Sequence, residues 1–160
     1  IVDVQYYLLL PDPTNVGSQL DVVRWSALLK SASALETYRR IYGKIVPHQV
    51  AELLILDRRF PRSMHFATIK AQESLRDISG SDAGTFCHPS EQLLGRLRSS
   101  MDYGDIGQIM QHGLHELIDD FQSQLNEIGQ AIHNDFFTAP TFRSPQNVSN
   151  QAQTLSPTSA

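Results

Sequence analysis

The sequence predicts an all-α fold, a helical bundle of about six or seven helices. Apolar residues recur at spacings of three and four along most of its 160 residues, as they do on the buried side of a helix. Prolines and glycines stand before and after these periodic stretches, where helices begin and end. No stretch alternates apolar and polar residues over the length of a strand.

The first predicted elements lie at the start of the chain. Residues 1–10 are apolar and helix-compatible, with no capping residue before them, and the two prolines that follow end the element. We therefore expect residues 1–10 to be the tail of a helix whose start is missing, and residues 11–18 to be a loop. A short helix over residues 20–30 follows, with apolar residues along one side.

Local signals mark the ends of the next helices. Ser33 and Glu36 have the spacing of a capping box at a helix start. Gly43 stands where a left-handed residue ends that helix. Pro47 suits the first position of the following helix, and Pro61 suits that of the one after it.

The helix that Pro61 opens carries a narrow stripe that we predict to face inward, and Gly80 ends it. The members of the stripe are Met64, Ala67, Ala71, Leu75 and Ile78. Its two alanines allow a neighbouring element to approach closely. Pro89 begins the helix after that one.

The strongest periodicity comes last, from Ile106 to Phe136, without a proline. It predicts one long helix over residues 102–137, about 45 to 50 Å in length at ~1.5 Å per residue. From residue 138 onward the composition changes to Ser, Thr, Pro, Gln and Asn. We therefore expect one helical domain over residues 1–137 and a disordered tail over residues 138–160.

Composition narrows the class of protein. The chain is 41% hydrophobic with a net charge of -4, so it lacks the basic composition that is typical of nucleic-acid-binding proteins. Its apolar runs are far shorter than the ~20 residues of a membrane span, and no leader is visible. Cys87 is the single cysteine, which suits a reducing cytoplasm. We expect a cytoplasmic protein that binds neither membrane nor nucleic acid.

Charge is distributed unevenly along the chain. Residues 101–137 contain seven acids and no lysine or arginine, whereas residues 39–98 carry ten basic residues against six acids. Two interpretations follow. The basic segment packs beside the acidic one within the molecule, or the acids form a surface for a partner.

Five polar residues form a candidate groove. Glu73 and Arg76 stand three apart on one predicted helix, and they form either an ion pair or part of a groove that binds a ligand. The others are His115, Glu116 and Asp119, of which the first and last share a helix face. These residues are the ones through which an enzyme would act on a substrate.

Other motifs for chemistry are weak. His112 with Glu116, and His115 with Asp119, have the spacing of metal ligands, but the patterns of zinc proteases and ferritin-like bundles are absent. Cys87 is followed by a histidine, yet sequence neighbours rarely form a nucleophile and base. No phosphate-binding glycine pattern occurs. We expect no metal and no cofactor, and the catalytic residues of any enzyme here remain unknown.

Several segments in order resemble the alpha-E family of bacterial helical proteins over residues 1–137. They are Ile1-Val-Asp-Val-Gln-Tyr-Tyr-Leu-Leu-Leu-Pro11, Trp25-Ser-Ala-Leu-Leu-Lys-Ser31, residues 36–43, Leu54-Ile-Leu-Asp57, Phe60-Pro-Arg-Ser63, Ala71-Gln-Glu-Ser-Leu-Arg76 and Gly113-Leu-His-Glu-Leu-Ile-Asp-Asp120. The resemblance implies that proteins of this family consist of two related helical halves, and that this chain is similar to the second half. It also implies a G-R-x-x-E-R-A-D type helix just before residue 1, which this sequence does not contain.

The resemblance also implies a biological setting. Genes of the family stand beside those of a circularly permuted ATP-grasp enzyme and a transglutaminase-like protein, in a system for peptide ligation or peptide modification. We therefore expect a non-catalytic accessory or scaffold module that acts with an ATP-grasp partner. The alternative is an enzyme of the same system that acts on a peptide or amino acid through the candidate groove.

A half-bundle without its preceding helix exposes apolar surface. We expect this surface between residues 6–10 and the last helix. The chain then associates with the upstream half of its full-length protein or with further copies of itself.

Overall fold

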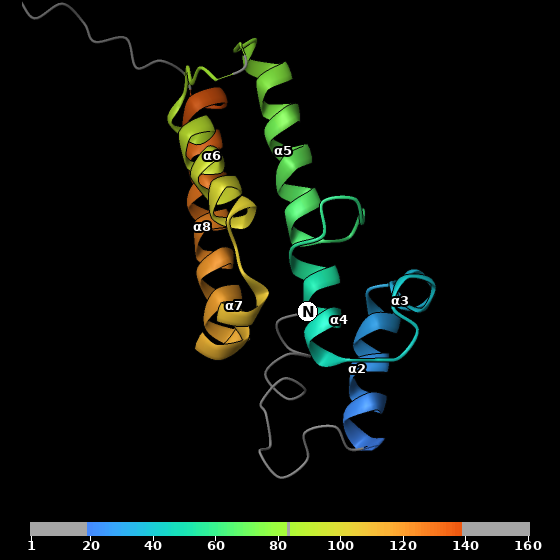
Figure 1. The fold of residues 1–160 in the computed structure, drawn as a ribbon. Helices are drawn as coiled ribbons and strands as arrows, with labels where there is room; N and C mark the ends of the chain where they lie inside the picture. The colour runs from blue at the N-terminus through green and yellow to red at the C-terminus, as the bar shows by residue number, and fades with distance from the viewer. Residues whose placement is uncertain (1–18, 83, 139–160) are drawn as a thin grey trace, which may run out of the picture.

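The computed structural model describes residues 19–82 and 84–138 of the chain (Figure 1). Within these ranges it contains seven helices and no strand, which confirms the all-α prediction. The helices are α2 (Gln19–Ser31), α3 (Leu35–Ile41), α4 (Pro47–Ile55), α5 (Met64–Ser79), α6 (Pro89–Asp102), α7 (Ile106–His112) and α8 (Leu114–Phe136). The predicted helix tail over residues 1–10, the loop over residues 11–18 and all but the first residue of the predicted tail lie outside the described residues.

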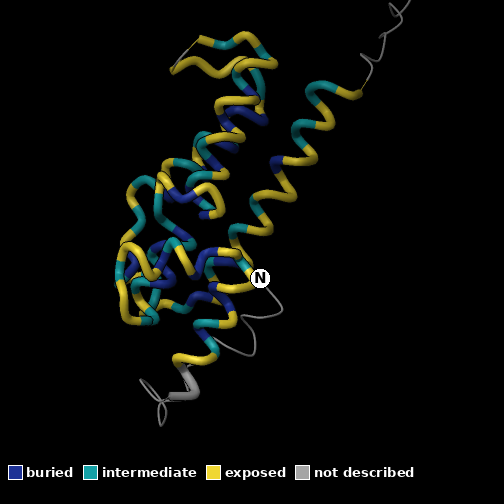
Figure 2. Tube along the Cα trace, turned by 90° about the vertical axis from the view of Figure 1, so that its right-hand side faces the viewer, coloured by how far each residue is buried: buried dark blue, intermediate teal, exposed yellow. Residues whose placement is uncertain are grey.

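The helices form two groups. The long helices α5, α6 and α8 lie side by side, with α6 packed against both of the others, and α2, α3 and α4 gather at one end of α5. The described residues form two apolar cores, and the larger one, built mainly on α2, α3 and α4, also includes Met101 of α6, Ile106 of α7 and Leu114 of α8. The smaller core joins α5, α6 and α8 through Leu75, Leu94, Leu97 and Ile128. Figure 2 shows that much of α8 is exposed along its length.

The proline and glycine signals predict several helix ends correctly. Pro47 and Pro89 are the first residues of α4 and α6. Gly43, which follows α3, has a φ of 77°, and Gly80, which ends α5, has a φ of 71°. Both values lie in the left-handed region that favours glycine.

The prediction of one continuous helix over residues 102–137 is wrong. The chain leaves the helical path after Asp102, and Asp105 begins α7 by accepting a hydrogen bond from the Gly107 backbone N–H at 2.7 Å. Gly113 then separates α7 from α8 with a φ of 117° and a ψ of 127°. α8, with 23 residues, is still the longest helix in the described ranges.

Two predicted helix starts are also wrong. Ser33 has a φ of 50° and belongs to the turn that ends α2, so α3 begins after Ala34 without a side-chain cap. Glu36 therefore does not complete a capping box. Pro61 lies in the turn before α5, and Ser63 caps α5 by accepting a hydrogen bond from the third backbone N–H of the helix at 3.0 Å.

The inward face of α5 differs from the predicted one. Of the predicted stripe, only Leu75 is buried, whereas Ala67, Ala71 and Ile78 are exposed and Met64 is half-buried. The other buried residues of the helix are His65, Thr68 and Gln72. The hydrogen bonds of these polar side chains, described below, explain this rotation of α5.

The break at Gly113 gives a test of the fold. A Cβ atom added at Gly113 would lie 1.9 Å from Glu116 Oε2, and the φ of 117° strains any other residue there. Gly113→Ala should therefore lower the free energy of unfolding by about 1 to 2 kcal/mol. Gly129→Ala is the control, because a Cβ there meets no atom within 4 Å and stands inside α8. It should raise the free energy by about 0.5 to 1 kcal/mol. Urea denaturation measures both, and equal effects would contradict the break.

Candidate functional site

The five residues of the candidate groove fall into two groups in the structure. Glu73 and Arg76 lie on α5, where Glu73 is exposed and its Oε2 atom lies 2.6 Å from Lys70 Nζ. His115, Glu116 and Asp119 are exposed on the first turns of α8. Within the described residues, Glu73 is therefore paired along its own helix.

The two groups lie at different heights along the bundle of α5, α6 and α8. Leu75, next to Glu73 and Arg76 in sequence, packs in the same core as Ile128 of α8. Ile128 follows Glu116 by 12 residues, a distance of about 18 Å along a helix. The structure therefore places these five residues in two separate surfaces.

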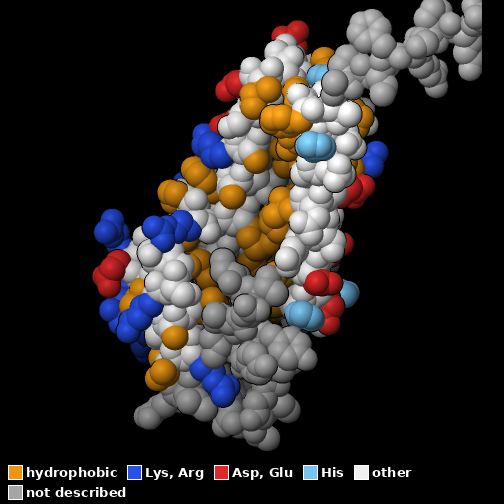
Figure 3. Space-filling model, turned by 180° about the vertical axis from the view of Figure 1, so that it is seen from behind, with side chains coloured by type: hydrophobic (Ala, Val, Ile, Leu, Met, Phe, Trp, Pro, Cys, Tyr) orange, Lys and Arg blue, Asp and Glu red, His pale blue; other side chains and the backbone are white. Residues whose placement is uncertain are grey.

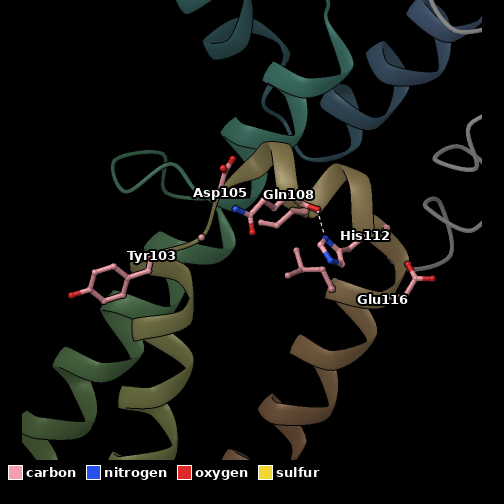
Figure 4. Close-up of a pocket in the computed structure, with 9 residues that line it drawn as sticks. Tyr103, Asp105, Gln108, His112 and Glu116 are labelled. Atoms are coloured by element: carbon pink, nitrogen blue, oxygen red, sulfur yellow. Dashed lines mark hydrogen bonds between the residues drawn. The ribbon is translucent and has the colours of Figure 1, made fainter.

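An open hollow of about 310 Å³ lies where α7 meets α8 (Figure 4). Its labelled polar side chains diverge: Tyr103 points away from it, and Asp105 and Glu116 point in different directions. The Nδ1 atom of His112 is 2.9 Å from the backbone oxygen of Gln108, within the same helix. Across residues 19–82 and 84–138, no group of three or more His, Cys, Asp or Glu residues is placed to hold a metal ion.

A polar cluster that sequence analysis missed surrounds Asp102, the last residue of α6; we call it the Asp102 cluster. Asp102 Oδ1 lies 2.8 Å from Arg58 Nη2 and 3.0 Å from His65 Nε2. Asp102 Oδ2 lies 3.5 Å from Arg98 Nε, and Arg98 Nη1 donates to Gln72 Oε1 at 2.7 Å. The cluster thus joins α5, α6 and the segment that precedes α5.

His65 explains the rotation of α5. Its side chain is 1% exposed, and its Nδ1 atom lies 3.1 Å from the Leu56 carbonyl oxygen while Nε2 faces Asp102. A buried polar group is stable when its hydrogen bonds are made, so His65 and Gln72 turn inward and the alanines turn outward. The imidazole is enclosed, which points to a structural rather than a catalytic role. The spacing of His65, Thr68 and Gln72, three and four apart, was the available signal.

A buried acid, Glu91, stabilises the start of α6. Its carboxylate accepts hydrogen bonds from Ser79 Oγ at 2.5 Å and from the backbone N–H groups of Cys87 and His88 at 2.6 and 3.0 Å. Burial alone would raise the pKa of Glu91, but the Ser79 and Ser81 hydroxyls and these two N–H groups lower it to about 2. Glu91 is therefore a fixed carboxylate at neutral pH.

Cys87 and His88, which are adjacent in sequence, lie beside Glu91 and play structural parts there. The Cys87 side chain is exposed, and the His88 ring packs against Phe136 with a centroid distance of 4.9 Å. The backbone N–H of Ser90 donates to Asp135 Oδ2 at 3.0 Å, which ties the end of α8 to the start of α6. These groups hold helices together.

The seven acids of residues 101–137 fall into two sets in the structure, one with internal partners and one exposed. Asp102, Asp105 and Asp135 make the internal ion pairs and backbone hydrogen bonds described above. The other four are exposed along α8, and no lysine or arginine of the described residues pairs with them. We call these four the acidic face: Glu116, Asp119, Asp120 and Glu127.

The described residues define a class of protein: an all-helical module whose buried polar clusters join helices and whose longest helix carries an acidic face. The chain belongs to the Alpha-E family, a predicted alpha-helical domain with a conserved ER motif, which matches residues 1–137. In these 160 residues no glutamate is followed directly by an arginine. Comparisons with curated proteins and with solved structures found no match. None of the helices in the described part of the chain has the length and hydrophobicity to cross a membrane.

The Asp102 cluster predicts a large effect of one substitution. Asp102→Asn removes the charge that faces the buried His65 and the partly exposed Arg58 and Arg98, and it should lower the free energy of unfolding by about 1 to 3 kcal/mol. Asp120→Asn, on the exposed side of α8, is the matched control and should change it by less than about 0.5 kcal/mol. Chemical denaturation measures both variants, and similar small effects would show that the cluster does not stabilise the fold.

Glu91 predicts a dependence of stability on pH. Its pKa in the folded protein, about 2, lies below the ordinary 4.5, so its contribution is complete above pH 4.5 and disappears as pH falls through 2. Glu91→Gln should cost about 2 kcal/mol at pH 7 and progressively less below pH 4.5. Glu73→Gln, on the surface, is the control. Melting temperatures from pH 7 to pH 2 test this, and a difference that stays constant would contradict it.

Proposed function

We propose that this chain is a non-catalytic accessory module that binds an ATP-grasp enzyme through the acidic face of α8. The system is one of peptide ligation or peptide modification in the bacterial cytoplasm. The observation that carries the proposal is the acidic face itself. Its four carboxylates are exposed, and no lysine or arginine of the described residues neutralises them.

The physical argument is electrostatic. The acidic face extends over 12 residues of α8, from Glu116 to Glu127, about 16 Å of helix, with four negative charges at neutral pH. Such a surface steers and orients a partner with a basic patch. A structural role is already filled by the other acids of the segment, each of which has internal partners. The gene neighbourhood of the alpha-E family supports the ATP-grasp enzyme as that partner.

Binding to the neighbouring ATP-grasp protein tests the proposal. The variant Glu116→Gln, Asp119→Asn, Asp120→Asn, Glu127→Gln should bind about tenfold more weakly at low salt, mainly through a slower association rate. The matched control neutralises four exposed acids elsewhere, Glu36, Glu73, Asp77 and Asp82. Surface plasmon resonance at about 50 and 500 mM salt gives both rates, and the wild type should lose most of its advantage at high salt.

The same experiment separates the module from the enzyme alternative. Equal weakening in both variants, or no weakening, contradicts docking through the acidic face. Turnover of a peptide by the full-length protein alone, abolished by Glu116→Gln and Asp119→Asn, supports the enzyme instead. In that case we expect the substrate to bind in the hollow beside α7 and Glu116.

A further inference from the structure

Basic residues are concentrated in the part of the chain that forms α2, α3 and α4. Residues 19–63, which contain these helices and the turn before α5, carry eight lysines and arginines against four acids. α8 has the opposite balance, because it contains five acids and no lysine or arginine. The chain therefore carries charge of opposite sign in two separate segments.

Five of these basic residues are exposed, and none of the five has an acidic partner within the described part of the chain. We call them the basic surface: Lys30, Arg40, Lys44, Arg59 and Arg62. An exposed charge without a partner stays available to a second molecule, and its attraction reaches about 8 to 10 Å at ordinary salt.

The turn before α5 brings members of the basic surface together. Arg62 Nη1 donates to the backbone oxygen of Ala32, directly after α2, at 3.1 Å. Arg59 and Arg62 lie on either side of Phe60 in sequence, and Phe60 packs in the larger core with residues of α2 and α3. The other three members lie in the last turns of α2 and α3 or just after α3. The basic surface is therefore located around the ends of α2 and α3.

The basic surface and the acidic face lie on opposite sides of the molecule. Figure 1 shows α2 and α3 on one side of α5 and α8 on the other side. Figure 3 shows lysine and arginine side chains mainly along one flank of the lower half, and acidic side chains along the other flank. Among the residues that the structure describes, no ion pair joins the two surfaces. Their charges therefore do not neutralise each other within one molecule.

We propose that copies of this chain associate head to tail, with the basic surface of one copy against the acidic face of the next. Charge complementarity carries the proposal. Within the described residues, the four carboxylates of one surface lack a basic partner and the five basic groups of the other lack an acidic one. A contact between two different surfaces leaves one of each kind unused at the ends of a pair, so further copies add unless a ring closes.

This inference goes beyond the proposed function and needs no second protein. Both use the four carboxylates of the acidic face, so a second copy and the ATP-grasp enzyme exclude each other there. The two proposals fail separately. Self-association depends on the basic surface, which docking on the enzyme does not use, and it is measured on the purified chain alone.

Sedimentation equilibrium on the full chain tests the proposal. At about 50 mM salt, the average mass should rise with protein concentration and reach at least about twice the mass of one copy by about 1 mM protein. At about 500 mM salt it should stay at the mass of one copy, because salt screens the charges. A single copy at every concentration in low salt, or association that persists in high salt, overturns the proposal.

Two variants locate the contact. The basic-surface variant is Lys30→Gln, Arg40→Gln, Arg59→Gln, and the acidic-face variant is the fourfold substitution described above for the ATP-grasp experiment. Each variant alone should stay at the mass of one copy in low salt. A 1:1 mixture should form pairs and nothing larger, because one variant retains the acidic face, the other retains the basic surface, and the remaining surface of each has lost most or all of its charge.

The matched control removes three basic residues from α5 and α6 instead: Lys70→Gln, Arg76→Gln, Arg96→Gln. It changes the net charge by the same amount as the basic-surface variant and should associate as the wild type does. Equal loss of association in these two variants overturns the proposal, since net charge then explains the effect. A mixture that forms no pairs also overturns it, and circular dichroism verifies that each variant is folded.

Discussion

The position of the Asp102 carboxylate determines how α5 and α6 fit together. Asp102 is the last residue of α6, and its partners come from α5, from α6 and from the segment before α5. The His65 imidazole is 1% exposed, and a buried polar group is stable only when its hydrogen bonds are made. His65 must therefore face α6. This fixes the rotation of α5 about its axis, and with it the outward direction of Ala67 and Ala71.

Local signals explain why so much of the fold is predictable from the sequence. The 3.6-residue period of a helix is set by residues close together in sequence. The helix starts at Pro47 and Pro89 and the left-handed glycines Gly43 and Gly80 are also set by the local sequence. Gly113 escapes prediction because a single glycine also occurs inside helices at a cost of only ~1 kcal/mol. Its φ of 117° separates α7 from α8 in the structure.

The inward face of α5 and the candidate site depend on distant partners. Asp102 stands 37 residues from His65 in sequence, and Asp135 stands 45 residues from Ser90. The charges in the sequence identify residues 101–137 as acidic. Only the structure distinguishes the acids that have internal partners from the four acids of the acidic face. The spacing of Glu73 and Arg76 likewise cannot show that Leu75 of α5 shares a core with Ile128 of α8, about 18 Å beyond Glu116.

The two sides of α8 differ in the range over which they act. Charges on the acidic face attract a basic partner over roughly a Debye length, about 8 Å at physiological salt, and weaken as salt rises. The buried side of α8, formed by Leu114, Ile118 and Ile128, acts only on contact, and its contribution grows with the area removed from water. A helix with both sides can therefore be fixed in its own bundle by the buried side while the acidic face orients a partner. Salt dependence is the property that separates the two contributions, because salt weakens association through the acidic face and leaves the packing of the buried side nearly unchanged.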